Sequence, residues 1–127
     1  MSITIIYHVT SLSEPIPSGQ RVLVIDIDGT LCSNTEGDYS AALPNHSAIR
    51  NVNLLFEQGA RIVLFTARGS TTNVDWSALT AGQMANWGVR HHELLFGKPF
   101  GHFYIDDKAV HAKDLESGKF LSTFDSF

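Results

Sequence analysis

The stretch Val24-Ile-Asp-Ile-Asp-Gly-Thr-Leu31 decides how this chain folds, because an apolar strand runs here into two aspartates and a Gly-Thr turn. Asp26 and Asp28 stand two positions apart, so both side chains would leave the same face of a regular strand. In open parallel sheets, ligands bind in the crevice beyond the carboxyl ends of the strands. Two carboxylates this close need a cation or protons, and Mg²⁺ is commonly held by carboxylates together with substrate phosphate. The stretch therefore favours phosphoryl chemistry. The alternative interpretation is that these residues only form an Asp-Gly turn without a catalytic role.

The two aspartates suit two different roles in such chemistry. Asp26 could attack phosphorus and form an aspartyl-phosphate intermediate, which divides one difficult hydrolysis into two easier displacements. Asp28 could protonate the leaving oxygen and later take a proton from water.

Length and composition narrow the class of protein. The 127 residues predict a single domain over 1–127, in which 1–20 form an N-terminal strand and loop extension. A net charge of −4 without a Lys/Arg run argues against a nucleic-acid partner. The single cysteine and the absence of a basic, apolar leader predict a cytoplasmic location. No stretch approaches the ~20 apolar residues that cross a bilayer, so no membrane partner is expected.

The hydrophobic pattern predicts alternating strands and helices. Strands are expected at 3–9, 21–27, 60–65, 93–96 and 102–105, and helices at 44–58, 74–87 and 108–116. Polar and small residues at 32–43 predict a flap over the first motif. The nearly continuous apolar run at 21–27 is typical of a sheet covered on both faces. The expected fold class is α/β, a three-layer Rossmann-like sandwich with a mainly parallel central sheet.

Three further expected strand ends carry chemical groups. Thr66 ends one strand, and its hydroxyl with the N–H groups of the following turn could bind a phosphate oxygen. Lys98 follows the next strand and could neutralise both Asp26 and the transferring phosphoryl group. Asp106 and Asp107 follow the last strand, and with Asp26 and the backbone carbonyl of Asp28 they could complete a Mg²⁺ site.

Four motifs together resemble those of the haloacid dehalogenase-like phosphatases. They are Asp26-Ile-Asp-Gly-Thr-Leu31, Phe65-Thr-Ala-Arg-Gly69, Gly97-Lys-Pro99 and Tyr104-Ile-Asp-Asp107. Residues 65–109 also resemble a small group of capsular-polysaccharide biosynthesis phosphatases. The resemblance implies a Mg²⁺-dependent phosphomonoesterase acting on a small phosphorylated metabolite such as a sugar or polyol phosphate. It implies Asp26 as nucleophile, Asp28 as acid/base, Thr66 and Lys98 as phosphate stabilisers, and Asp106 with Asp107 as metal-binding acids.

The spacing of these motifs leaves no room for the cap domain that members of this family commonly carry, so a capless, open site is expected. Specificity would then come from the flap at 32–43, from the loop at 67–76, or from a second subunit in a homo-oligomer. The expected substrate-binding residues are Gly29, Thr30, Ala67, Arg68 and Asn73. For Arg68 a structural ion pair is the open alternative to a substrate contact, and the C-terminal phenylalanines are expected on the domain's own core or on another subunit.

Two other functions remain open at this stage. A receiver-like phospho-acceptor domain also combines acids, a hydroxyl and a lysine, but there the acid pair precedes the phosphorylated aspartate along the chain. Here the pair Asp106-Asp107 comes last. The second alternative is a phosphatase acting on nucleic-acid ends, against which the acidic balance counts.

Overall fold

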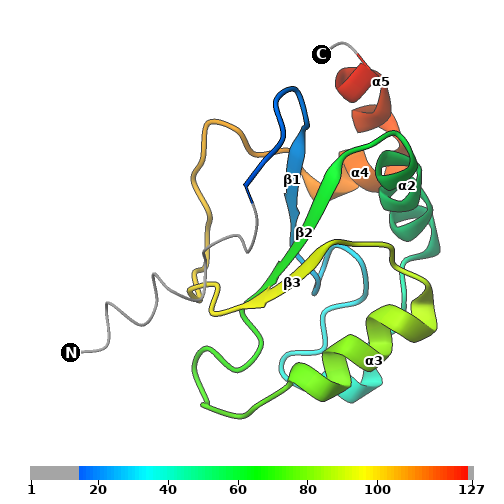
Figure 1. Cartoon of the computed structure of the whole chain (residues 1–127). Helices are drawn as coiled ribbons and strands as arrows, with labels where there is room; N and C mark the ends of the chain where they lie inside the picture. Colours follow the sequence, from blue (N-terminus) through cyan, green and yellow to red (C-terminus); the bar gives the residue numbers. More distant parts are fainter. Residues whose placement is uncertain (1–14, 126–127) are drawn as a thin grey trace.

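The computed structural model describes residues 15–125, so the expected strand at 3–9 lies outside the described part. The chain forms a small α/β fold around a three-stranded parallel sheet, as the sequence predicts (Figure 1). The elements, in order, are β1 (Val22–Ile25), η1 (Tyr39–Ala41), α2 (His46–Glu57), β2 (Arg61–Thr66), α3 (Ser77–Trp87), β3 (Glu93–Phe96), α4 (Ala112–Ser117) and α5 (Lys119–Asp125).

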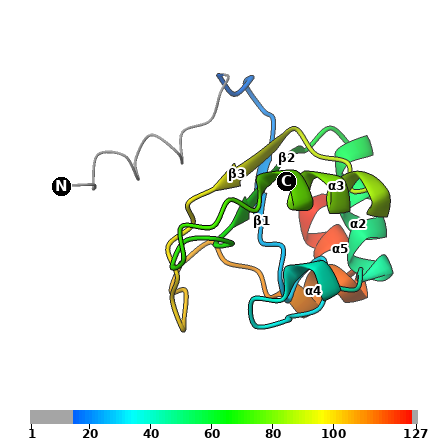
Figure 2. The same ribbon diagram turned by 90° about the horizontal axis from the view of Figure 1, so that it is seen from below.

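The sheet follows the order of the chain. Its strand order is β1-β2-β3, and the register pairs Leu23 with Ile62 and Leu64 with Leu94. Right-handed crossovers that step in one direction place their helices on the same face of the sheet. Accordingly, Figures 1 and 2 show all four α-helices on one side of the sheet, while the connection from β3 to α4 runs along the other. The third layer of the expected sandwich is therefore not formed by residues 15–125.

The prediction of a strand at 102–105 is wrong. These residues have no regular structure, and Phe103 and Ile105 are 86% and 99% exposed. The Tyr104 hydroxyl closes the segment into a loop instead, since it donates to the Pro99 carbonyl at 2.8 Å and accepts from the Gly101 N–H at 3.1 Å. In the described part of the chain β1 is thus an edge strand.

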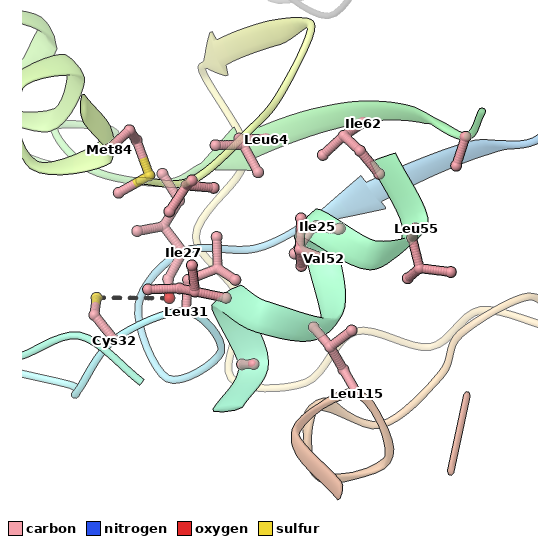
Figure 3. Close-up of a cluster of buried hydrophobic side chains, with 14 of the residues drawn as sticks. Ile25, Ile27, Leu31, Cys32, Val52, Leu55, Ile62, Leu64, Met84 and Leu115 are labelled. Atoms are coloured by element: carbon pink, nitrogen blue, oxygen red, sulfur yellow. Dashed lines mark hydrogen bonds between the residues drawn. The ribbon is translucent and has the colours of Figure 1, made fainter. Parts of the chain in front are cut away.

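The core lies between the sheet and the helices (Figure 3). Helix α2 contributes Val52 and Leu55, which are fully buried in the same cluster as Ile62 of the central strand. Met84 of α3 and Leu115 of α4 complete the cluster. This packing fixes the loops at the carboxyl ends of the strands.

Several helix boundaries differ from expectation. Helix α2 begins at His46 and not at Pro44, because Asn45 caps it with a side chain that accepts from the Ala48 N–H at 3.1 Å. Helix α3 begins at Ser77, because the Asp75 carboxylate accepts from the backbone N–H and the hydroxyl of that residue. Helix α5 was not expected, but its Phe120 packs against the domain's own core.

Candidate active site

The first motif leaves β1 in a tight turn. The N–H groups of Thr30 and Leu31 both donate to the Ile27 carbonyl, at 3.1 and 2.8 Å. Gly29 has φ +82°, and a Cβ there would lie 2.8 Å from the Asn34 side chain, so the turn needs glycine at this point. Ile27 and Leu31 are fully buried and anchor the turn in the core. The two aspartates are thereby held at the carboxyl end of the sheet.

Asp26 and Lys98 form the expected pair. The Lys98 Nζ lies 3.4 Å from Asp26 Oδ1, and the Asp26 side chain is 37% exposed, which leaves it accessible to a substrate. Partial burial raises the pKa of Asp26 above its ordinary value, although the Lys98 charge and the Ile27 N–H act in the opposite direction. The pair therefore presents a carboxylate beside a cation in a partly desolvated place.

Lys98 is positioned by several contacts from neighbouring loops. Its N–H donates to the Thr66 carbonyl at 3.2 Å, and the Ser70 hydroxyl donates to the Lys98 carbonyl at 2.7 Å. The Lys98 Nζ also lies 4.2 Å from the centre of the Tyr104 ring, a cation–π contact. The loop that replaces the expected strand thus helps to hold the lysine near Asp26.

Asp28 faces a different partner. Its two carboxylate oxygens accept from Nε and Nη2 of Arg68 at 3.0 and 2.9 Å, a bidentate ion pair. The Arg68 side chain is 0% exposed. The structural ion pair, which the sequence left open for Arg68, is therefore what the chain forms.

Thr66 is also enclosed. The residue is 1% exposed, and its hydroxyl accepts from the Arg68 backbone N–H at 3.1 Å. In this arrangement the hydroxyl orders the turn after β2, and it is not open to a phosphate oxygen as expected. The neighbouring Ala67 is partly exposed on the same turn.

A cleft of about 320 Å³ opens beside this turn, between the loop after β2 and the end of β3. Its lining residues include the polar and aromatic residues Ser70, Asn73, Asp75, Trp76, Ser77 and Phe96, together with Arg68, Gly69, Val74 and Gly97; the buried Arg68 side chain itself stays with Asp28. Asn73, expected to bind substrate, does line it, with φ +58°. A Cβ on Gly69 would lie 2.4 Å from the Val74 carbonyl oxygen, so the loop is tightly closed.

The acids of the last motif are not gathered around the first. Asp106 and Asp107 lie on the exposed loop before α4, and Asp106 accepts from the Lys108 N–H at 2.8 Å. Within residues 15–125 no group of three or more His, Cys, Asp or Glu side chains is arranged to hold a metal ion. In the described part of the chain, the Mg²⁺ site expected from Asp26, the Asp28 carbonyl, Asp106 and Asp107 is therefore not assembled, because the strand that would carry the last two acids does not form.

Three residues that sequence reasoning missed complete the surroundings of Asp28. Thr80 and Gln83 of α3 accept from Nη1 of Arg68 at 3.0 and 2.6 Å, and the Tyr39 ring centre lies 4.7 Å from the Arg68 guanidinium carbon. The available signal was the placement of Thr80 and Gln83 three positions apart, on the same helix face as Met84. Polar groups at such positions need buried partners.

Cys32 borders the same cluster, and its thiol is expected to be unreactive in the folded protein. Burial, with a contribution from the Asp28 charge, raises the pKa of Cys32 to about 12, because the thiolate would be desolvated. At pH 8 we expect no reaction with a thiol-specific disulfide reagent over an hour, and full reaction in guanidinium chloride. Equal rates in the folded and unfolded protein would contradict this burial.

Comparisons with known proteins bear on the fold. No protein-family model and no curated protein sequence matches the chain. The fold is similar to the crystal structure of an MCSG target from Vibrio cholerae, at 29% identity and a TM-score of 0.71, over 84% of this chain and 98% of that chain. None of the helices in the described part of the chain has the length and apolar character needed to cross a membrane.

Two structures of the Pnkp1/Rnl/Hen1 complex, one of them described as an RNA repair complex, are similar at 20% and 18% identity. Their TM-scores are 0.52 and 0.50. The match covers 88% and 89% of this chain, but only 38% and 35% of those chains. At these identities the similarity shows a shared fold alone.

Proposed function

We propose that this chain is a phosphomonoesterase of the haloacid dehalogenase-like type, acting in the cytoplasm on a small phosphorylated metabolite. The observation that supports it best is the half-buried Asp26 carboxylate, 3.4 Å from Lys98 Nζ at the carboxyl end of β1, with Asp28 two residues further on. The proposal includes the capless Rossmann-like sandwich and a sugar or polyol phosphate as substrate. The open cleft with Trp76, Phe96 and Asn73 on its walls suits a hydroxylated ligand with an apolar face.

The proposed reaction has two displacements. In the first, an Asp26 oxygen attacks phosphorus, the bond from phosphorus to the leaving oxygen breaks, and Asp28 gives that oxygen its proton. In the second, water attacks phosphorus, the bond from phosphorus to Asp26 breaks, and Asp28 takes the proton of the water. Lys98 stabilises the charge on the phosphoryl oxygens in both steps.

We propose Mg²⁺ as the cofactor, although the acids in the described part of the chain are not arranged to bind it. Asp26 and the adjacent acids Asp106 and Asp107 are hard oxygen donors of the kind Mg²⁺ takes, and when bound the ion would neutralise phosphoryl charge. In the described structure, however, the acids do not form a group able to hold it. Binding would require the exposed loop at 102–107 to approach Asp26.

We therefore expect Mg²⁺ both to be required for turnover and to raise the melting temperature. Binding to the folded state alone stabilises it in proportion to the logarithm of the ion concentration. The measurement is phosphate release and thermal unfolding with MgCl₂ or with excess EDTA. Asp106→Asn should remove the thermal shift, and Asp114→Asn, an acid of α4, should keep it. Full turnover in EDTA together with an unchanged melting temperature would refute the cofactor.

The substrate class is tested by one screen. Phosphorylated sugars and polyols are expected to be hydrolysed faster than 3′- or 5′-phosphorylated oligonucleotides. The second candidate, a phosphatase of nucleic-acid ends, is retained because the fold is shared with part of a chain in an RNA repair complex. The net charge of −4 counts against it, since nucleic-acid sites are usually basic. Faster hydrolysis of an oligonucleotide phosphate would favour the phosphatase of nucleic-acid ends over the metabolite phosphatase.

A further inference from the structure

The guanidinium of Arg68 has no donor left for a substrate. An arginine side chain carries five N–H donors. Two of them bind the Asp28 carboxylate at 3.0 and 2.9 Å, and Nη1 binds Thr80 and Gln83 at 3.0 and 2.6 Å. The remaining hydrogen on Nη2 faces the Cys32 sulfur at 3.8 Å. Each donor therefore has an acceptor within the protein.

This arrangement is held from several elements at once. The Arg68 N–H is fixed by the Thr66 hydroxyl after β2, and the guanidinium is fixed by α3. The Tyr39 ring of η1 lies against it at 4.7 Å, and the Gln83 amide donates to the Tyr39 carbonyl at 2.7 Å. Because β2, α3 and the flap all contribute, the guanidinium has a single position.

The consequence falls on Asp28. Each of its oxygens accepts one guanidinium N–H, which fixes the plane of the carboxylate. A carboxylate has about four lone-pair sites. Oδ1 also accepts from the Cys32 thiol at 3.5 Å, so Oδ2 is the oxygen that keeps a site for another partner. The Asp28 side chain is 19% exposed, so this remaining hydrogen-bond acceptor site is accessible from the candidate active site.

We propose that Arg68 is a positioning residue, which orients Asp28 for proton transfer and makes no contact with the substrate. This role rests on the proposed function, because Asp28 transfers a proton only in the proposed phosphatase reaction. Thr80 and Gln83 act on Asp28 indirectly. They accept hydrogen bonds from the Arg68 guanidinium, which in turn binds the Asp28 carboxylate. The fork geometry matters more than the charge, because lysine cannot bind both oxygens in one plane.

The test compares leaving groups in Arg68→Lys. With an alkyl phosphate, whose departure needs a proton, kcat should fall roughly tenfold to a hundredfold, the scale of a misplaced acid. The burst of p-nitrophenol from p-nitrophenyl phosphate needs no proton on the leaving group, and its rate should change less than about threefold. KM for both substrates should stay within about twofold, because no substrate contact is lost.

Milder variants keep the test decisive if Arg68→Lys does not fold. Thr80→Val and Gln83→Leu each remove one acceptor from Arg68 while Asp28 and Arg68 remain, and both should show the same selective loss to a smaller degree. Asn53→Ala is the matched control, since it removes hydrogen bonds to Gly88 and Arg90 away from the site. It should lower stability without changing the ratio between the two substrates.

The outcomes separate the two proposals. If Asp28→Asn shows the selective loss but Arg68→Lys and Thr80→Val do not, the positioning role is overturned and the phosphatase stands. A raised KM with unchanged kcat would make Arg68 a substrate contact and overturn the role as well. If the wild-type protein hydrolyses no phosphomonoester, the proposed function fails, and the positioning role fails with it.

Discussion

Replacing Asp26 by Asn is expected to lower phosphate release by about a thousandfold or more, because an amide cannot form the covalent intermediate. The folded structure should persist, since the two side chains are of equal size. The measurement is steady-state phosphate release from p-nitrophenyl phosphate and from a sugar phosphate. Asp114→Asn, the same chemical change on α4, should keep full activity.

The melting temperature of Asp26→Asn supplies a second readout. The surroundings raise the pKa of Asp26, so the ionised form is less favourable in the folded protein than in the unfolded chain. Removing the charge should therefore leave the melting temperature at pH 7 unchanged or slightly raised. The difference from the wild type should shrink as the pH falls and Asp26 itself becomes protonated. Near-normal turnover in a folded Asp26→Asn protein would mean that another residue is the nucleophile.

Replacing Arg68 by Ala is expected to have the largest effect on stability. Removing one partner of a buried ion pair leaves an uncompensated charge, at a cost of roughly 3–5 kcal/mol. Here the Asp28 carboxylate would lose both charge-assisted hydrogen bonds, and Thr80 and Gln83 would lose their donor. Such a loss is a large part of the total stability of a domain of this size, which is typically ~5–15 kcal/mol.

Urea unfolding followed by circular dichroism measures this loss. Arg50→Ala is the matched control, because Arg50 lies exposed on α2, where such a change costs within about 0.5 kcal/mol. Equal midpoints for the two variants would contradict the structural role of Arg68. This expectation follows from the structural ion pair, which the sequence left open beside a substrate contact for Arg68.

The order of strands and helices through β3 was predictable because its signals are local. Apolar runs marked the strands, and the expected strand at 93–96 coincides with β3. The segment at 102–105 carries a similar apolar pattern, yet its structure is decided by the Tyr104 hydroxyl and by whether another strand pairs with it. Neither influence can be read from residue spacing, so the prediction of a strand at 102–105 was wrong.

The same division applies to the site. The pairing of Lys98 with Asp26 could be expected, because the carboxyl ends of all the strands in one parallel sheet meet at the same edge. The burial of Arg68 could not, because a charged residue is normally exposed unless it finds several partners. Those partners, Thr80 and Gln83, come from a helix that begins nine residues later, at Ser77.

The rim of the cleft limits how its selectivity could be re-engineered. Gly69 tolerates no side chain, Asn73 requires a residue that accepts a positive φ, and Ser70 is committed to the Lys98 carbonyl. Thr71 and Val74 are exposed on the same loop and free of these particular constraints. A randomised library aimed at new substrates would therefore be concentrated on these last two positions, where variation changes the surface of the rim and leaves its backbone path intact.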